Sequence, residues 1–352
     1  MNFYAYRLPG AAGAAETVTS ASETLTEGIG VPGFAVCAFR KSDRKLHTIP
    51  EGTPFPLEEM NRMAFENMDA DLDSFPCEST SREEHEREVN DIVNKIKCGL
   101  FRKAVAARAI IREIPLDLAA TFRKLCDLHP DAFVFCFHSD ISGTWIGATP
   151  ERLISRHGDL IESMALAGTR PAGTGGCWDT KNIDEHNFVV FHIQTILAKA
   201  HITPAIDQAR TLGAGPVEHL MTRISYRIPD DMPEERRADL DTRRLAVRLS
   251  PSPAVSGYPA DVALNYLESA ESFDRNLYGG FIGPVYQIDG PDTEADFFVN
   301  LRSMRVEPRR VCIYAGGGIT IDSVAADEWD ETERKASTLI NALIGLNLNT
   351  NL

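Results

Sequence analysis

The apolar segments of this sequence are mostly of strand length, and this constrains the fold more than any other feature. The runs 34–39, 133–138 and 297–302 are short, rich in aromatic and aliphatic residues, and bounded by Gly or polar residues, which is typical of buried strands. Neither a GxGxxG motif nor a P-loop follows such a run, so a parallel sheet wound from βαβ units is not favoured. The pattern predicts a mixed α/β (α+β) fold whose strands pair largely antiparallel.

Longer segments with helical periodicity lie between these strands. Apolar residues at helical spacing predict helices at 81–99, 117–129, 183–201, 261–271 and from about 326 to the C-terminus. The stretches 50–80, 229–243 and 249–259 lack this pattern, and we expect surface loops and exposed charged segments there. A hydrophobic content of 43% in 352 residues is enough for a large core, in one large domain or two.

Charge and composition exclude several classes of function. A net charge of −15 without a basic stripe argues against a nucleic-acid partner. No apolar run approaches the ~20 residues of a membrane span, and the N-terminus lacks the plan of a signal peptide. The seven cysteines are scattered without CxxC spacing, which predicts reduced thiols and no zinc site. We therefore expect a cytoplasmic protein.

The segment 311–335 combines a strand, glycines and a charged helix. A strand at 311–314 runs into Gly316–Gly318, a short polar loop follows, and a helix begins near residue 326. One face of this helix carries charged residues at i, i+3 and i+7: Glu328, Glu331 and Lys335. They could hold a hard cation and a carboxylated ligand beside the glycines. A glycine turn followed by a solvated, salt-bridged helix face is the alternative, and the segment alone favours it.

Three further charged residues lie at or near the start of predicted elements. Lys103 begins the predicted strand 100–114, where it could extend to solvent from a sheet edge or stand in a site. Glu151 follows Thr-Pro at the start of a strand, as a turn carboxylate or as an acid that points inward. Glu185 lies in the first turn of the helix predicted at 183–201, a position that the helix dipole alone favours.

These motifs together resemble one family, the chorismate-utilising enzymes. This family includes isochorismate synthase, salicylate synthase, and the chorismate-binding subunits of anthranilate and aminodeoxychorismate synthase. The resemblance covers about residues 85–345, with matching stretches in order at 103–108, 147–153, 166–169, 185–186, 219–220, 251–257, 275–283, 302, 315–319 and 328–335. Each stretch alone is weak, but their common order and spacing make a strong signal.

The resemblance implies a fold and a metal ion. The fold is a single large chorismate-binding domain of two antiparallel sheets packed as a sandwich, with helices outside and the active site in a cleft at one end. Residues 81–352 would form the chorismate-binding core, and residues 1–80 would add N-terminal strands and loops to the same fold. Mg²⁺ would be held by Glu185 and Glu331, while Glu328 orients water or belongs to the outer shell of the metal.

The resemblance also implies how chorismate is bound. The metal would bind the carboxylate on the ring, in keeping with the preference of Mg²⁺ for few carboxylates and a substrate oxygen. The enolpyruvyl carboxylate would meet a set of groups that the resemblance places together: Tyr278, Arg302, Lys335 and the backbone N–H groups near Gly316. The Gly168–Thr169 pair would let the backbone approach the ring.

Two positions separate the branches of the family. The anthranilate branch resembles this chain but has glutamine at the position of Lys103, and the aminodeoxychorismate branch often has a lysine at the position of Ala167. This chain has Lys103 and Ala167, the combination found in isochorismate and salicylate synthases. Lys103 would be the base that activates water for attack at C2, which requires a lowered pKa, and Glu151 the acid that protonates the leaving C4 hydroxyl, which requires a raised pKa. The chain would then be an isochorismate synthase, an isomerase of menaquinone or siderophore biosynthesis.

Other functions stay open at this point. A salicylate synthase would use the same residues and then eliminate pyruvate, and a non-catalytic protein would bind chorismate without turnover. The family pattern His-Pro-Thr-Pro is Ser-Pro-Ser-Pro here, at residues 250–253, and the segment 170–184 looks short for the family. We expect a monomer or a weak homodimer.

Overall fold

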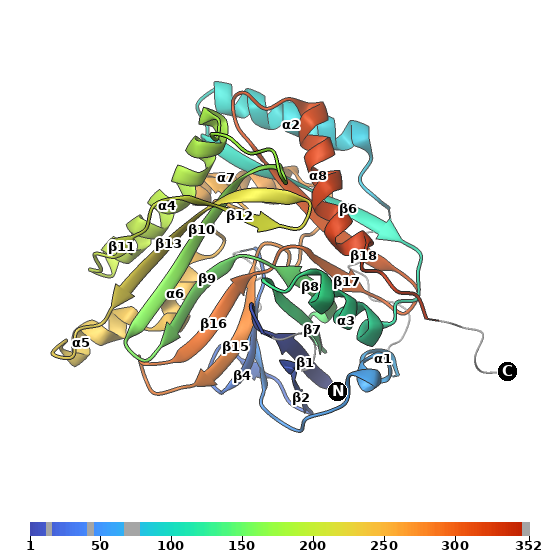
Figure 1. Ribbon diagram of the computed structural model, residues 1–352, viewed down its shortest axis with the longest axis vertical. Helices are drawn as coiled ribbons and strands as arrows, with labels where there is room; N and C mark the ends of the chain where they lie inside the picture. The colour runs from blue at the N-terminus through green and yellow to red at the C-terminus, as the bar shows by residue number, and fades with distance from the viewer. Residues whose placement is uncertain (12–15, 41–45, 67–77, 347–352) are drawn as a thin grey trace.

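Two large antiparallel sheets form the body of the molecule in the computed structural model, which describes residues 1–11, 16–40, 46–66 and 78–346 (Figure 1). The first, eight-stranded sheet has the order β14 (Gly257–Tyr258), β6 (Lys103–Arg112), β18 (Val311–Ile319), β17 (Ser303–Val306), β8 (Gly143–Thr149), β7 (Phe133–Ser139), β1 (Asn2–Arg7) and β2 (Val18–Ser22). The second, ten-stranded sheet has the order β11 (Ala205–Ile206), β13 (Val217–Arg227), β10 (Leu160–Pro171), β9 (Arg152–His157), β16 (Glu294–Val299), β15 (Phe281–Gln287), β4 (Gly33–Cys37), β5 (His47–Pro50) and β3 (Thr26–Glu27), and β12 (Arg210–Ala214) also pairs with β13. The predicted α/β fold with two antiparallel sheets is confirmed.

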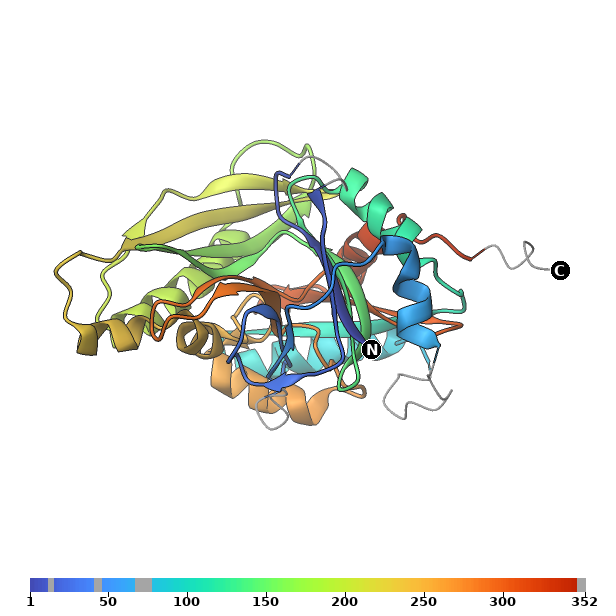
Figure 2. The ribbon, with the colours of Figure 1, turned by 90° about the horizontal axis from the view of Figure 1, so that it is seen from below.

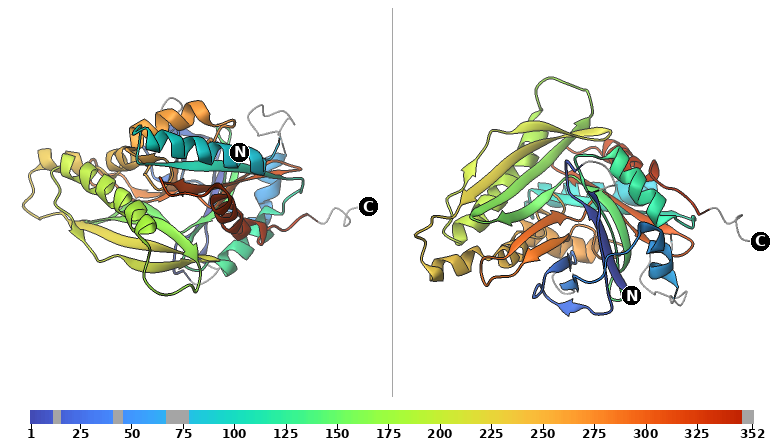
Figure 3. Two further views of the ribbon diagram at one scale, coloured as in Figure 1. Left: turned by 90° about the horizontal axis from the view of Figure 1, so that it is seen from above. Right: turned by 60° about the horizontal axis from the view of Figure 1, so that its bottom comes forward.

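Helices cover the outer faces of these sheets. They are η2 (Leu57–Glu59), α1 (Met60–Phe65), α2 (Arg82–Lys97), α3 (Leu118–Leu128), α4 (Thr180–Lys199), α5 (Glu234–Arg237), η3 (Ala238–Leu240), α6 (Thr242–Leu249), α7 (Ala260–Ala270) and α8 (Ala325–Ile340). Helices α2 and α7 pack on β6 and lie side by side (Figure 3). They lie on the opposite side of the molecule from the β12–β13 hairpin (Figure 2). In the part of the chain that the structure describes, no helix is both long and apolar enough to span a membrane.

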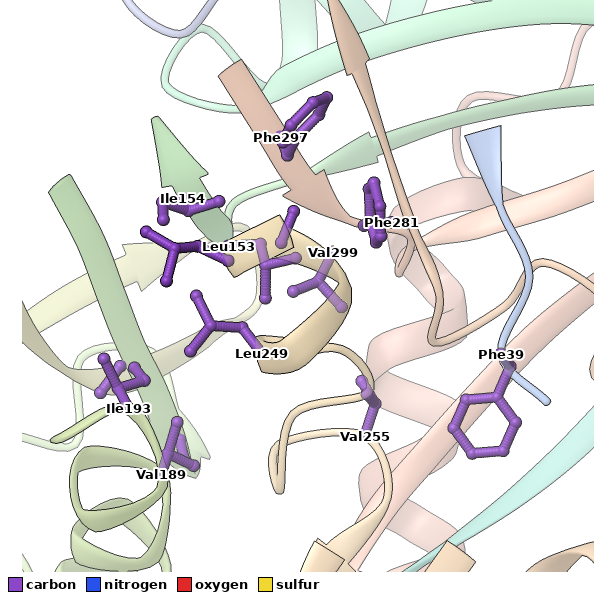
Figure 4. Packing of buried hydrophobic residues seen from close by; sticks show 14 of the residues in the cluster. Phe39, Leu153, Ile154, Val189, Ile193, Leu249, Val255, Phe281, Phe297 and Val299 are labelled. Atoms are coloured by element: carbon purple, nitrogen blue, oxygen red, sulfur yellow. The ribbon is translucent and has the colours of Figure 1, made fainter. Parts of the chain in front are cut away.

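Local sequence signals explain where these elements begin and end. Helix α2 begins at a complete capping box, in which Ser81 and Glu84 satisfy each other's backbone N–H groups. It ends before Gly99, whose φ of +80° is the left-handed conformation that glycine adopts easily after a helix. The apolar sides of α4 and α6 meet over β9, where Val189, Leu249 and Leu153 contribute to one buried cluster (Figure 4).

Two expectations about helices were wrong, and one helix was not predicted. No element was predicted between the charged segment 229–243 and the loop 249–259, but helix α6 spans this interval, because several arginines obscure the helical spacing of its buried residues Leu245 and Leu249. Helix α1 lies within the predicted loop 50–80, and Met60 packs into the core. Part of that loop, 67–77, is outside the described residues. Helix α8 ends at Ile340 instead of continuing to the C-terminus.

Candidate active site

A cavity with about 610 Å³ of empty space, open solvent included, lies between the two sheets, and most of the residues singled out in the sequence surround it. Seven of them line it directly: Glu151, Thr169, Glu185, Tyr278, Arg302, Gly316 and Lys335. Three others touch this lining: Lys103 contacts Glu185, Glu331 contacts Lys335, and Gly168 accepts a hydrogen bond from His219. Glu328 lies one layer further out, beside Gly317. The structure therefore brings together side chains that are far apart in the sequence.

Lys103 is completely buried at the start of β6. Its Nζ atom lies 2.9 Å from Oε1 of Glu185, which the second turn of α4 presents to the cavity. The alternative that Lys103 extends to solvent from a sheet edge is wrong, since its side chain is 0% exposed. Burial raises the pKa of Glu185, but the charges of Lys103, Lys335 and Lys181 outweigh this effect and leave that pKa below its ordinary value.

The three glutamates predicted to bind a metal are each paired with a different lysine. The N–O distances are 2.9 Å for Lys103–Glu185, 2.7 Å for Lys181–Glu328 and 2.6 Å for Lys335–Glu331. Burial and the neighbouring Glu331 raise the pKa of Glu328, and Lys181 opposes them. Because each carboxylate faces its own lysine, no set of three His, Cys, Asp or Glu side chains is assembled around one point among the described residues.

Sequence reasoning did not single out Lys181. It precedes Glu185 by four residues, so it lies one turn away on the same face of α4. Its ammonium group reaches Glu328 on α8, and the two helices are thereby joined across the site. The helical spacing to Glu185 was the signal that could have identified it.

The glycines of β18 make room for these carboxylates. The predicted end of the strand before the glycines is wrong, because β18 continues through them to Ile319, paired with β6. A Cβ atom at Gly318 would lie 2.1 Å from Oε1 of Glu185, and one at Gly317 would lie 3.2 Å from Oε2 of Glu328. A side chain at either position would therefore occupy the space that the carboxylates use.

Glu151 approaches the cavity from the turn between β8 and β9. It is 3% exposed, and its backbone carbonyl accepts a hydrogen bond from the N–H of Val299. Burial raises the pKa of its carboxyl to about 8, although Lys103, the Ser252 hydroxyl and Lys335 oppose the shift. The carboxyl is therefore protonated at neutral pH. Ser252 belongs to the Ser-Pro-Ser-Pro stretch in which this chain departs from the family pattern.

A chain of hydrogen bonds fixes Arg302 at another wall of the cavity. Its guanidinium donates to Thr338 Oγ1 at 2.7 Å and lies 3.3 Å from Nε2 of His219. Nδ1 of His219 lies 3.0 Å from the carbonyl of Gly168, which can only accept, so we assign the proton to Nδ1 and leave Nε2 to accept from Arg302. Burial lowers the pKa of His219 to about 3, which keeps the ring neutral. Sequence reasoning noted the His219–Leu220 motif but did not include His219 in the site.

The structure explains why position 168 is a glycine, which the sequence alone did not reveal. Gly168 lies at a bulge of β10 with a φ of +75°, and a Cβ atom there would lie 2.9 Å from the carbonyl oxygen of Asn182. The side chain of Asn182 accepts a hydrogen bond from the N–H of Thr169 at 2.8 Å. The glycine therefore allows the start of α4 to pack closely on β10, which fixes Glu185 relative to Thr169.

Tyr278 and Tyr314 form an aromatic wall. Their rings stack with centroids 5.5 Å apart, and both residues line the cavity. A Cβ atom at Gly316 would lie 3.2 Å from the Tyr278 hydroxyl, so glycine is needed for this close approach. The cavity therefore offers an aromatic surface flanked by the cations of Arg302 and Lys335, which suits an anion with an unsaturated ring.

Comparisons with known proteins agree with this geometry. The model of a family described as chorismate binding enzyme matches residues 57–344. The salicylate biosynthesis isochorismate synthase of Pseudomonas aeruginosa is 32% identical over 274 residues, which are 74% of this chain and 55% of that protein. The vibriobactin-specific isochorismate synthase of Vibrio cholerae is 26% identical over 77% of this chain and 69% of its own length. The chain thus spans little more than half of the first of these relatives.

A solved structure shows the same fold. The menaquinone-specific isochorismate synthase MenF of Escherichia coli superposes with a TM-score of 0.76, over 98% of this chain and 89% of the other, at 21% sequence identity. Anthranilate synthase component I of Streptococcus pneumoniae superposes with a TM-score of 0.63 at 17% identity, over 96% of this chain and 92% of the other.

Proposed function

Because the chain belongs to the chorismate binding enzyme family, we propose that it is an isochorismate synthase, an isomerase that converts chorismate to isochorismate. One observation carries the proposal. The buried amine of Lys103 and the buried acid of Glu151 adjoin the same cavity, and the raised pKa of Glu151 keeps this acid protonated. An amine that takes a proton and an acid that gives one are what the exchange of two hydroxyl groups requires.

The proposed reaction exchanges one water molecule for another. Lys103 takes a proton from the incoming water molecule while the oxygen of that water bonds to C2. Both ring double bonds shift by one position, from C1=C2 and C5=C6 to C1=C6 and C4=C5, and the C4–O bond breaks. Glu151 donates the proton with which that hydroxyl leaves as water. Substrate and product have the same composition, so the reaction is reversible. Only the neutral amine of Lys103 can act as this base.

The other residues of the cavity would hold the substrate. Arg302 and Lys335 would bind the enolpyruvyl carboxylate, with the Tyr278 hydroxyl and the backbone N–H near Gly316 beside it. The hydrogen bonds from Arg302 to Thr338 and His219 would keep the guanidinium oriented while the ligand enters. Thr169, on the bulge of β10, would approach the ring.

The donor chemistry of the site fits a hard divalent cation such as Mg²⁺. Glu185 and Glu331 would be its ligands, and Glu328 would bind it or orient one of its waters. Oε2 of Glu328 is buried and has no hydrogen-bond partner among the described residues, and glycines leave space beside all three carboxylates. When bound, the ion would hold the ring carboxylate and stabilise the negative charge there.

The wider setting of the enzyme follows from the same proposal. The relatives are named for salicylate and vibriobactin biosynthesis, and the structural relative for menaquinone. We infer that this chain supplies isochorismate to a pathway of menaquinone or siderophore biosynthesis in the cytoplasm. With a net charge of −15 it would act without nucleic acid or membrane partners, as a monomer or a weak homodimer.

Product analysis tests this proposal. The purified protein is incubated with chorismate, with and without Mg²⁺, and the products are separated by chromatography with mass detection. A new compound with the mass of chorismate, formed only with the metal, is the expected result. Salicylate with pyruvate would identify a salicylate synthase instead, and bound but unconverted chorismate would identify a binding protein.

The raised pKa of Glu151 predicts how activity depends on pH. The value of kcat/KM for chorismate should fall as the pH rises through about 8, because the acid loses its proton there. Stability should follow the same group. The pKa of Glu151 is near 4.5 in the unfolded chain and about 8 in the folded protein. Its protonation therefore contributes fully to the free energy of unfolding below about pH 4.5, and this contribution is lost as the pH rises to about 8. The Glu151→Gln variant should be inactive and should lack this loss in thermal unfolding measured against pH. An identical pH dependence in both proteins would contradict the assignment.

Gly318 offers a test of the space that the carboxylates need. In Gly318→Ala the new methyl group would displace Glu185 and the Lys103 side chain, so we expect kcat/KM to fall about 100-fold. Gly30→Ala is the matched control, since among the described residues the only atom near the added methyl group is a side-chain carbon 3.9 Å away, and its kinetics should be unchanged. Equal kinetics of the two variants would show that the carboxylate does not need its present position.

A further inference from the structure

A second cavity, of about 550 Å³, adjoins the first on the far side of Arg302. The two cavities share Pro150 and Arg302 in their linings. The second lies between the C-terminal end of α3 with residues 129–132 and the tip of the β12–β13 hairpin at 212–215. It has no role in the proposed chemistry.

The residues that line the two cavities differ in exposure. Every residue that lines the first cavity is buried or half-buried. The second cavity begins at exposed residues, among them Leu128, Asp131 and Gly213, and ends at the buried Arg302 and Thr338. It therefore runs from the surface to the wall of the first cavity.

The opposite edge of the β12–β13 hairpin is closed by a set of side-chain contacts. Arg170 donates a hydrogen bond to Glu218 at 2.9 Å, and its guanidinium stacks on Trp178 with Cζ 4.1 Å from the ring centre. The indole of Trp178 donates to Thr211 at 3.0 Å, and the N–H of Gly173 donates to Glu218 at 2.8 Å. These contacts tie the segment 172–179 to the hairpin, whereas the edge that faces α3 is left hollow.

The two walls of the second cavity differ in character. Arg7 fixes one wall, because its guanidinium donates to the backbone carbonyls of Cys126, His129, Pro130 and Ala132. The facing wall carries small side chains, Gly213, Ala214 and Gly215. The guanidinium of Arg302 stands at the inner end, where it would attract a carboxylate.

We propose that this second cavity is the passage through which a small dicarboxylate reaches the active site, with Arg302 as the cation at the junction. The proposal rests on the proposed function, since chorismate is the dicarboxylate in question. A passage has a kinetic signature that a binding site lacks. Narrowing it slows association and dissociation by the same factor and leaves Kd unchanged, because the bound state keeps all its contacts.

Gly213→Trp is the variant that tests the passage. The φ of Gly213 lies outside the left-handed region and nothing lies within 4 Å of a Cβ atom built there, so a side chain can begin at this position without a clash. Leu128→Trp narrows the cavity from the other wall, at a residue that is 42% exposed. Gly30→Trp is the control, since its nearest neighbour is a side-chain atom 3.9 Å away and it lies outside both cavities.

The rates are measured by stopped-flow fluorescence with chorismate and Mg²⁺, in a Lys103→Ala background that prevents turnover. We expect both rate constants to fall at least about tenfold in Gly213→Trp, and to fall in Leu128→Trp, with Kd unchanged and with no effect of Gly30→Trp. Unchanged rates in both folded variants would overturn the passage, and so would a weaker Kd with an unchanged association rate. If the Lys103→Ala reference protein itself fails to bind chorismate, the proposed function is wrong, and the proposal of a passage is then wrong as well.

Discussion

Replacing Lys103 with alanine should lower kcat for isochorismate formation by about 10³-fold, within the range by which general bases accelerate reactions. The amine is buried in contact with Glu185, so in the variant no group stands in its place to take the proton of the attacking water. Chorismate binding with Mg²⁺ should persist, because Arg302 and Lys335 are untouched. Steady-state kinetics and equilibrium binding separate these two effects.

A second substitution at the same position serves as the control. Lys103→Arg keeps the positive charge beside Glu185, but a guanidinium does not lose its proton in proteins, so this variant should be as inactive as the alanine variant. If charge alone mattered, the arginine variant would keep most of the activity. Turnover within a few-fold of the wild type in either variant would show that Lys103 is not the base.

Replacing Glu331 with glutamine should raise the Mg²⁺ concentration needed for half-maximal activity by at least about tenfold. The amide has nearly the same shape but carries no charge, so the site loses part of its attraction for a hard cation. The partner Lys335 keeps its second contact, a hydrogen bond of 3.0 Å to the carbonyl of Gly316. The effect should therefore appear in metal dependence before it appears in the KM for chorismate.

The same helix offers a matched control for this measurement. Glu333 lies two residues further along α8, pairs with Arg108, and is half exposed outside the cavity. Glu333→Gln changes the net charge by the same amount, so its metal dependence should equal that of the wild type. A Glu331→Gln variant that behaves like the control would remove Glu331 from the metal ligands.

The structure shows why some parts of the site could be predicted from the sequence. Lys103 begins a mostly apolar strand, and burying such a group is costly unless it is paired or has a function. Glu151 and Glu185 had simple local explanations, and the order and spacing of the family motifs singled them out before any contact was known. The antiparallel sandwich could be predicted for a similar reason, since short apolar runs without phosphate-binding loops exclude most parallel folds.

The parts that could not be predicted depend on contacts between distant segments. His219 matters because β13 brings it between Gly168 and Arg302, and nothing in its local sequence indicates this. Lys181 matters because α8 brings Glu328 to it. The glycines 316–318 were interpreted as the end of a strand because glycine usually interrupts strands, but here they make space for side chains from other elements.

Incorporation of oxygen from the solvent tests the central claim most directly. Chorismate is converted by the purified protein with Mg²⁺ in water labelled with ¹⁸O, and the mass of the product and the position of the label are determined. If Lys103 activates a water for attack at C2 while Glu151 expels the C4 hydroxyl, each isochorismate formed should carry one labelled oxygen, at C2. An unlabelled isochorismate would show that the hydroxyl migrates within the substrate, and an absence of product would show that the chain is not an isochorismate synthase.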